Sequence, residues 1–343
     1  MKKQHSIGNR VYVYIFIAFL IFYGIFVAIR AIRNSAFLDQ RDRVNIVFYG
    51  EEPKLLSFGL TDDVNYIVSF TNEDRADIPG GYGRYAVGSF GRLAEVERNK
   101  AIIRHAFASM TSTYIDYYVA PKKSLGVFVN SDAAEPTYQR GGLIRSLFSA
   151  NTYTNANFFD KIYLSWLIAK KRQSSFIPLK STVVPGKNGA KPSFSEKGFQ
   201  KKYKGFFYHQ GLREESGEVQ IRYQNYASAL VLSRIIEGQG IRVVDLSLGE
   251  TLIHQRCIVQ HNLSSKSKTV YFLLKRFSCL EQKGDAGGSD ILFILGPELE
   301  KEWEWYENTT NFGNNFGDRF YSGLKVDEGF WFLPGNWEIA PSA

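Results

Sequence analysis

The sequence predicts an α/β fold behind a single N-terminal transmembrane helix. An uncharged apolar run opens the chain, short apolar segments then alternate with segments of helical spacing, and a second, smaller unit repeats this alternation. The 343 residues suffice for about two domains, and 44% hydrophobic against 22% charged residues exclude a disordered chain. We therefore expect an α/β domain with a mixed sheet and a small βαββαβ C-terminal domain.

Residues 1–33 are the predicted membrane anchor. Residues 11–29 contain no charge, and a helix of that length covers roughly the ~30 Å hydrocarbon core of a bilayer. The alternative is a cleavable signal peptide, but its apolar run is usually only about 7–15 residues long and is followed by a small-residue cleavage site. Lys2, Lys3 and Arg10 precede the run, which favours a short cytoplasmic N-terminus.

Residues 34–180 are the predicted first α/β domain. Strands are expected at the short apolar runs 44–49, 64–70, 115–119, 125–129 and 176–179. Helices are expected where apolar residues recur at helical spacing, at 88–111, 141–149 and 157–172. The segment 78–83 contains three glycines and a proline, which is typical of a turn.

Three further segments are predicted. Residues 181–216 contain many lysines, prolines and glycines with little apolar periodicity, which indicates an exposed basic linker. Residues 217–296 form the small domain, with elements in the order βαββαβ at 218–223, 226–237, 241–246, 253–260, 264–277 and 290–295. The tail 297–343 is acidic and aromatic; we expect it to pack onto the preceding domains, with carbohydrate or partner binding as the alternative.

The charge distribution argues against nucleic-acid binding. The net charge is +8, but residues 1–33 contribute +5 and residues 170–204 contribute +9, so the rest of the chain is negative. A nucleic-acid-binding domain would have a basic face of its own, and we expect no such partner. The sequence contains no Ser-His-Asp, His-Glu-x-x-His or Walker pattern, which removes support for common hydrolases and nucleotidases.

Two stretches resemble a bacterial cell-envelope family. Residues 217–296 are similar to the LytR-type C-terminal domain, through a strand ending at Asn225, a helix ending at Gly240, the run Ile241-Arg-Val-Val-Asp245 and the closing Ser289-Asp-Ile-Leu-Phe-Ile-Leu-Gly296. Residues 44–180 more loosely resemble the LytR-CpsA-Psr domain, through 44–50, Asp63 before a strand, Ile78-Pro-Gly-Gly-Tyr-Gly83 and Ile115-Asp-Tyr-Tyr-Val119. The resemblance implies that residues 34–343 are extracytoplasmic.

The resemblance also implies a site with acids that hold Mg²⁺ and arginines that neutralise a pyrophosphate. Glu52 and Asp63 match the acidic positions and are the candidate metal ligands. Thr61 and Asn72 stand where arginines are expected, and neither replaces a guanidinium group. The candidate catalytic residues are Asp63, Arg75, Arg84 and Arg140.

Two functions follow from this resemblance. The missing arginines favour a binding or scaffold role in cell-wall glycopolymer assembly, with a degraded catalytic site. The alternative is a Mg²⁺-dependent phosphotransferase that moves glycopolymer from polyprenyl pyrophosphate to peptidoglycan. The expected partners are the membrane and a polyprenyl-linked or anionic cell-wall polymer.

Both cysteines of the chain fall in the predicted small domain. Cys257 lies within an expected strand and Cys279 directly after the second expected helix. They are a disulfide candidate, and two buried free thiols are the alternative.

Overall fold

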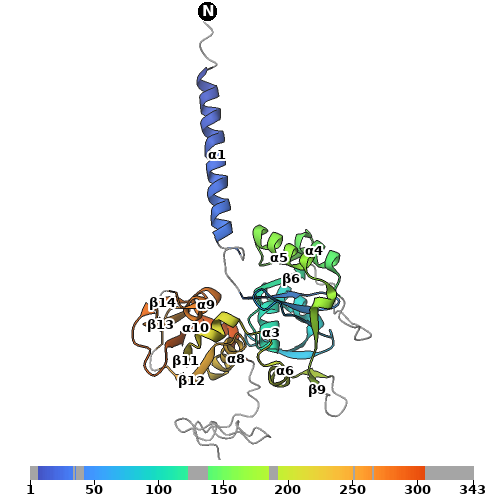
Figure 1. Cartoon of the computed structure of the whole chain (residues 1–343), viewed down its shortest axis with the longest axis vertical. Coiled ribbons are helices and arrows are strands. Elements are labelled where there is room, and N and C mark those ends of the chain that lie inside the picture. The colour runs from blue at the N-terminus through green and yellow to red at the C-terminus, as the bar shows by residue number, and fades with distance from the viewer. Residues whose placement is uncertain are drawn as a thin grey trace, which may run out of the picture. The chain divides into compact units, whose positions relative to one another are not determined.

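The chain begins with a long helix, α1 (Ile7–Arg33), which two α/β units follow (Figure 1). The computed structural model describes residues 7–33, 35, 42–122, 138–184, 192–249, 252–264 and 266–305. Within α1, the described side chains from Tyr12 to Val27 are all exposed. The predicted strand at 125–129 and residues 306–343 of the predicted tail lie outside the described residues.

The predicted membrane anchor is corrected by the structure. Across the described ranges, no helix combines the length and the apolar content that crossing a membrane requires. This finding contradicts both the single N-terminal transmembrane helix and the single-pass placement with a cytoplasmic N-terminus and extracytoplasmic residues 34–343.

A mixed six-stranded sheet lies at the centre of the first unit, in the order β7-β6-β1-β2-β3-β8. β1 is parallel to β6 and β3 to β8, whereas the other neighbours are antiparallel. The strands are β1 (Arg43–Phe48), β2 (Lys54–Gly59), β3 (Asn65–Ser69), β6 (Tyr117–Pro121), β7 (Thr152–Thr154) and β8 (Phe176–Lys180). The α/β class with a mixed sheet is confirmed, but β2 is a strand that the sequence analysis did not predict.

Helices cover both faces of this sheet. Neighbouring strand residues such as Ile46 and Val47 point to opposite faces, and both are fully buried. Strands buried on both faces form continuous apolar runs, which is how the sequence reveals them. One face is covered by α2 (Phe90–Val96) and α3 (Ala101–Thr111), and the other by α4 (Arg140–Phe148) and α5 (Phe158–Lys170) (Figure 1). Short 3₁₀ turns, η1 (Val87–Ser89) and η2 (Gln173–Ser175), precede α2 and β8.

The described parts of the predicted linker, residues 181–184 and 192–216, are folded rather than an exposed linker. It contains β9 (Val183–Val184), β10 (Ser193–Phe194), α6 (Glu196–Tyr203) and α7 (Gln210–Glu215). β10 lies between β9 and β4 (Arg75–Ile78), and β5 (Gly83–Ala86) completes this four-stranded sheet. The expected turn at 78–83 is the connection from β4 to β5. Aromatic side chains explain why the segment packs: Phe194, Phe199, Tyr203 and Phe207 are buried in the core.

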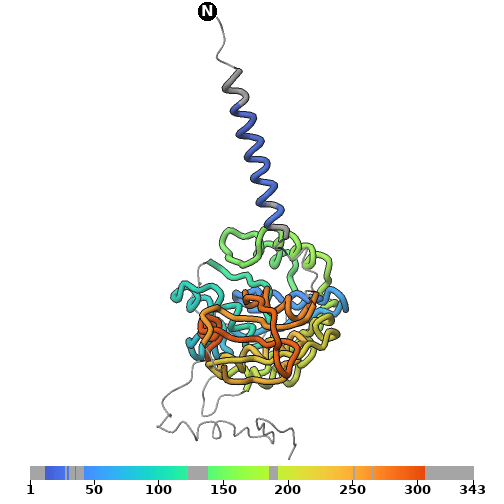
Figure 2. Tube along the Cα trace, turned by 90° about the vertical axis from the view of Figure 1, so that its left-hand side faces the viewer, coloured from blue at the N-terminus to red at the C-terminus, as the bar shows by residue number. Residues whose placement is uncertain are grey.

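The C-terminal unit contains a five-stranded sheet in the order β12-β11-β15-β13-β14. Figure 2 shows the chain of this unit in yellow to red. Its elements are β11 (Glu218–Tyr223), α8 (Tyr226–Glu237), β12 (Arg242–Leu248), β13 (Cys257–His261), α9 (Lys268–Phe277), β14 (Leu280–Lys283), β15 (Ile291–Leu295) and α10 (Pro297–Trp303). Alternate residues of β11 are buried, as its sequence pattern predicted. The unit therefore contains the predicted βαββαβ order with one extra strand, β14, before the last.

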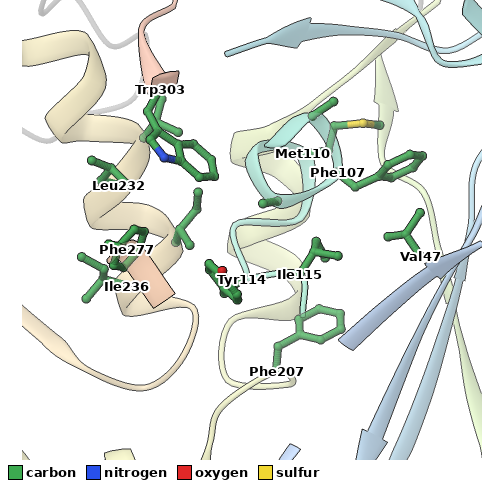
Figure 3. Close-up of a cluster of buried hydrophobic side chains, with 14 of the residues drawn as sticks. Val47, Phe107, Met110, Tyr114, Ile115, Phe207, Leu232, Ile236, Phe277 and Trp303 are labelled. Carbon is green, nitrogen blue, oxygen red and sulfur yellow. The ribbon is translucent and has the colours of Figure 1, made fainter. Parts of the chain in front are cut away.

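One hydrophobic core joins the two units (Figure 3). It extends from Val47 of the first sheet through α3 to Phe293 of the second. Nine of the eleven α3 residues are buried, because α3 is covered from both sides. At the end of α8, a Cβ atom on Gly238 would collide with the carbonyl oxygen of Ser112, so the two helix ends meet through backbone. Trp303 of α10 is also in this core, as expected for the start of the tail.

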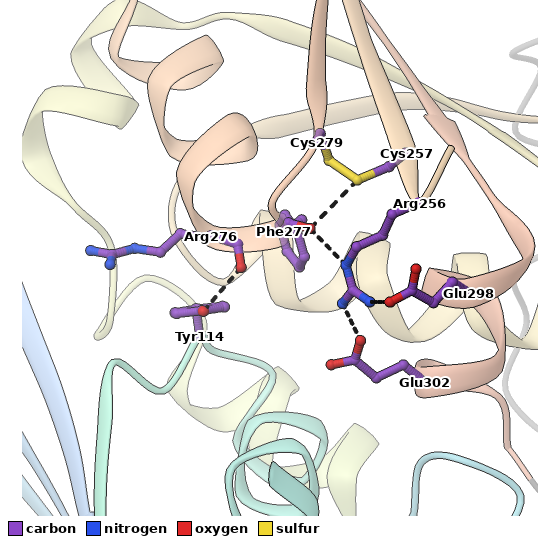
Figure 4. Close-up of a disulfide and its surroundings, with 8 residues drawn as sticks. All are labelled: Tyr114, Arg256, Cys257, Arg276, Phe277, Cys279, Glu298 and Glu302. Carbon is purple, nitrogen blue, oxygen red and sulfur yellow. Dashed lines mark hydrogen bonds and ion pairs between the residues drawn. A yellow bond between two sulfur atoms is a disulfide. The ribbon is translucent and has the colours of Figure 1, made fainter. Parts of the chain in front are cut away.

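Buried polar contacts also join the units. The guanidinium of Arg276, at the end of α9, lies 3.0 Å from the carboxylate of Asp116, which is itself 3% exposed. The same carboxylate accepts a hydrogen bond from the backbone N–H of Asn45 at 2.9 Å. The Tyr114 hydroxyl donates to the Arg276 carbonyl at 3.1 Å (Figure 4). These partners compensate for the desolvation of the ion pair.

A second polar cluster fastens α10. Glu302 accepts a hydrogen bond from the buried His105 of α3 at 2.7 Å and forms an ion pair with Arg256 (Figure 4). Burial alone would raise the pKa of Glu302, but the hydrogen bonds from His105 and Arg256 outweigh it and lower that pKa to about 2. Arg256 also contacts Glu298 at 2.8 Å.

We expect Glu302 to contribute to acid stability. Its pKa in the folded chain is below the ordinary 4.5, so its stabilising contribution is present above pH 4.5 and is lost as the pH falls toward 2. The Glu302→Gln variant should have a lower free energy of unfolding than wild type at neutral pH. Between pH 4.5 and pH 2, its free energy of unfolding should fall less than that of wild type. Urea denaturation at several pH values measures this. Glu298→Gln is the matched control because Glu298 is 72% exposed; an acid dependence equal to wild type in Glu302→Gln would contradict the assignment.

The two cysteines form a disulfide between Cys257 and Cys279 (Figure 4). Cys257 begins β13 and Cys279 directly precedes β14, and the next residues, Ile258 and Leu280, are partners in the strand ladder. All four residues of β14 are exposed, so little apolar packing holds this edge strand. The disulfide therefore attaches β14 to the sheet.

We expect the unreduced protein, once denatured, to show no titratable thiol. Removing the bond by the double change Cys257→Ala and Cys279→Ala should lower the free energy of unfolding by roughly 3 kcal/mol, from the entropy of closing a loop of this length in the unfolded chain. Urea denaturation measures the difference. Wild type treated with a reductant is the control, because it loses the disulfide but keeps the packing of both cysteine side chains. Two titratable thiols in unreduced protein would contradict the pairing.

Candidate functional site

Glu52 lies in the turn between β1 and β2, at the edge of the sheet where β1 ends. Its carboxylate lies 2.6 Å from the ammonium group of Lys54. Asn72, at a position where the family resemblance expects an arginine, is 1% exposed and donates a hydrogen bond to the Glu51 carbonyl at 2.6 Å. Asn72 therefore holds the turn, and its neutral amide supplies no charge for a phosphate.

Asp63 lies in the turn between β2 and β3, at the opposite end of β2. It forms an ion pair with Lys171, and the hydrogen bond from Lys171 lowers the pKa of the Asp63 carboxyl. The adjacent Asp62 lies 2.8 Å from the guanidinium of the buried Arg43. Thr61, the other position expected to be an arginine, donates to Asp42 at 3.1 Å. The acids of this turn thus fasten the turn to the fold.

The two candidate metal ligands do not converge. Glu52 and Asp63 flank β2, whose six residues place its ends roughly 16 Å apart at ~3.3 Å per residue. Carboxylates that share one Mg²⁺ lie within about 5 Å of each other. Within the described ranges, no three His, Cys, Asp or Glu residues are grouped so that they could hold a metal ion. The residues present therefore do not fit the Mg²⁺ site that the resemblance implied.

The candidate arginines are also dispersed. Arg84 of β5 pairs with Asp77 of β4 at 2.6 Å, and Arg75 is exposed at the start of β4. Arg140 is exposed at the start of α4, where it donates to the Ala169 carbonyl at 3.4 Å. β4 and β5 belong to the small four-stranded sheet, whereas α4 covers the central sheet. The structure thus brings none of these three arginines together with Asp63.

A basic surface on and beside α6 is the feature that the sequence analysis missed. We define the α6 surface as five exposed lysines: Lys180, Lys197, Lys201, Lys202 and Lys204. The net charge of residues 170–204 was evident, but the segment was expected to be a linker. The signal for a helix is local: Phe199 and Tyr203 are four residues apart, and Ser195 can cap the first turn.

The packing of α6 fixes this surface. The Ser195 hydroxyl accepts a hydrogen bond from the Gly198 N–H at 3.1 Å and so caps the helix. Phe199 is fully buried, and the Tyr203 hydroxyl contacts both the N–H and the carbonyl of Lys180 at 3.0 Å. These contacts hold α6 against the end of β8. The lysines therefore extend from a fixed element instead of a loose chain.

The two acids beside the α6 surface, Glu196 and Glu237, are half-buried. Glu196 is the single acid among residues 170–204, and burial raises its pKa. Burial also raises the pKa of Glu237, with Lys204 acting in the opposite direction. Between α6 and the ends of α3 and α8 lies a hollow of about 20 Å³, which is room for one water molecule. The α6 surface is thus an open cationic face.

Comparison with known proteins places the chain beside LytR-CpsA-Psr structures. TagT of B. subtilis is 13% identical over 48% of this chain and 89% of its own, with a TM-score of 0.33. TagV of B. subtilis is 10% identical over 47% of this chain and 97% of its own, with a TM-score of 0.32. A second TagT structure, described as the LytR-CPS2A-psr family protein YwtF with bound octaprenyl pyrophosphate lipid, is 11% identical over 47% of this chain and 87% of its own. Its TM-score is 0.31. No family model and no curated protein sequence matches the chain. Similarity at this level assigns no ligand to it.

We expect millimolar Mg²⁺ to leave the thermal stability of the protein unchanged. A ligand that binds the folded state raises the melting temperature, and Glu52 and Asp63 are too far apart to chelate one ion. Calorimetry with and without MgCl₂ tests this, with Glu52→Ala and Asp63→Ala as companion variants. A Mg²⁺-dependent rise in wild type that either variant abolishes would contradict the reading of the site.

Proposed function

We propose that this protein binds an anionic cell-envelope glycopolymer through the α6 surface and does not transfer it. The observation that carries the proposal is the set of lysines fixed on a packed helix with little exposed negative charge beside them. Lysine binds phosphate as a point charge and does not need an enclosed pocket. An open row of such charges suits a chain of repeated phosphate groups more than a single small ligand.

The separation of the carboxylates supports the non-catalytic part of the proposal. Transfer from a pyrophosphate carrier needs a cation or arginines at the developing phosphate charge. Here Glu52 and Asp63 are engaged by Lys54 and Lys171, and Asn72 holds a turn. The sequence resemblance at residues 44–180 and 217–296 supports the cell-wall context.

The test is binding to poly(glycerol phosphate) and to lipid-linked wall teichoic acid, the type of ligand carried by a similar TagT structure. In the full chain, Lys197→Glu with Lys201→Glu should weaken binding roughly tenfold, and binding by wild type should fall steeply with salt. The matched control is Lys266→Glu with Lys301→Glu, which changes the net charge equally at exposed sites of the C-terminal unit. Affinity is measured by fluorescence anisotropy with labelled polymer.

Two results would overturn the proposal. Equal losses in both double variants would show a general charge effect in place of an α6 site. Mg²⁺-dependent turnover of a polyprenyl-pyrophosphate-linked polymer by the purified protein would show that the chain is a phosphotransferase after all.

A further inference from the structure

One face of α5 carries exposed apolar side chains at helical spacing. Phe158, Ile162 and Trp166 are four residues apart and are 64%, 40% and 54% exposed. The helix itself is well fixed, because Asn157 and Asp160 form a capping box at its start and Leu164, Leu167 and Ile168 are buried. We call Phe158, Ile162 and Trp166 the α5 stripe.

Positive charge surrounds the α5 stripe. Lys161 and Lys170 lie on the same helix, and the Lys170 ammonium group lies 5.1 Å from the centre of the Trp166 ring. Tyr163 stacks on Trp166 with ring centres 6.1 Å apart. Asp160 is the single acid between residues 138 and 184, and it is 4% exposed. Within residues 138–184 the exposed charge is therefore all positive. The exposed Asp63, from the turn between β2 and β3, pairs with Lys171 just beyond the C-terminal end of α5.

We infer that the α5 stripe is a docking surface for an anionic lipid bilayer, entered by its aromatic rings and attracted by the lysines around them. Tryptophan and tyrosine favour the boundary between headgroups and acyl chains, and Lys and Arg favour anionic headgroups. This is a contact with the surface of the bilayer, and it goes beyond polymer binding at the α6 surface.

Two observations favour a bilayer over a protein partner. Three side chains on one helix expose far less area than the ~1,000 Å² that a stable protein interface buries. A second copy of this chain would bring its own Lys161 and Lys170 against those of the first, and like charges repel at such contacts. A bilayer supplies both an apolar layer and a negative surface.

The test uses a local probe, because α1 has exposed apolar side chains of its own. Ile162→Cys is labelled with an environment-sensitive fluorophore in the full, unreduced chain, where the disulfide leaves no other thiol. Val96→Cys on α2 is the matched control, since Val96 is also apolar and is 69% exposed. The vesicles contain either phosphatidylcholine alone or phosphatidylcholine mixed with phosphatidylglycerol.

With mixed vesicles, the probe at residue 162 should shift to the blue and be quenched by spin-labelled lipid, whereas the probe at residue 96 should not respond. Adding Lys161→Glu and Lys170→Glu should raise the lipid concentration at half-response at least about tenfold, because each basic residue near an anionic bilayer contributes about fivefold. Three outcomes would overturn the inference. The probes at residues 162 and 96 could respond equally, the probe at residue 162 could respond equally to neutral and mixed vesicles, or it could fail to respond to mixed vesicles. A blue shift that grows with protein concentration without lipid would assign the stripe to self-association instead.

Discussion

The buried ion pair between Asp116 and Arg276 constrains the whole structure. Each charge would be strongly destabilising alone in the interior, and the ion pair between them forms only when both units are in place. Around this pair, α3 is buried from both sides and contributes to a core that neither sheet completes by itself. The described chain therefore has three sheets, and its larger hydrophobic core is shared by both units. The α6 surface is held by this shared core through Phe199 and Tyr203, whereas the helix of the α5 stripe packs on the other face of the central sheet.

Much of the fold was accessible from the sequence, because the central strands are short apolar runs and the helices have regular spacing. The C-terminal unit was predicted nearly complete, since β11 alternates and α8 ends near glycines. β2 was not predicted although Leu55, Leu56 and Phe58 are fully buried, because Ser57 interrupts its short apolar run. The strands and helices within the described parts of residues 181–216 were missed because lysines and glycines dominate the composition of this segment. Its few aromatic residues nonetheless determine where it packs.

The missed strand also determines how far apart the candidate metal ligands lie. Eleven positions separate Glu52 from Asp63, and that spacing is compatible with one loop holding both acids. Because β2 runs between them, the two acids lie at opposite ends of this strand. Motif matching assigns acids to roles by their order along the chain, whereas chelation depends on their separation in space. The pairing of Asp63 with Lys171 was likewise beyond the sequence, because Lys171 is distant along the chain.

The position of α10 has a consequence for how the chain folds during translation. The Glu304 carbonyl accepts hydrogen bonds from the N–H groups of Gly80 and Gly81, and Trp303 fills the core beside α3. A ribosome delivers these residues after almost every other described element, so the nascent first unit waits with part of α3 uncovered. Long-range closure of this kind slows folding and leaves apolar surface open to aggregation. The protein should therefore depend on chaperones during synthesis, and premature termination before α10 should produce an aggregating fragment instead of a functional half.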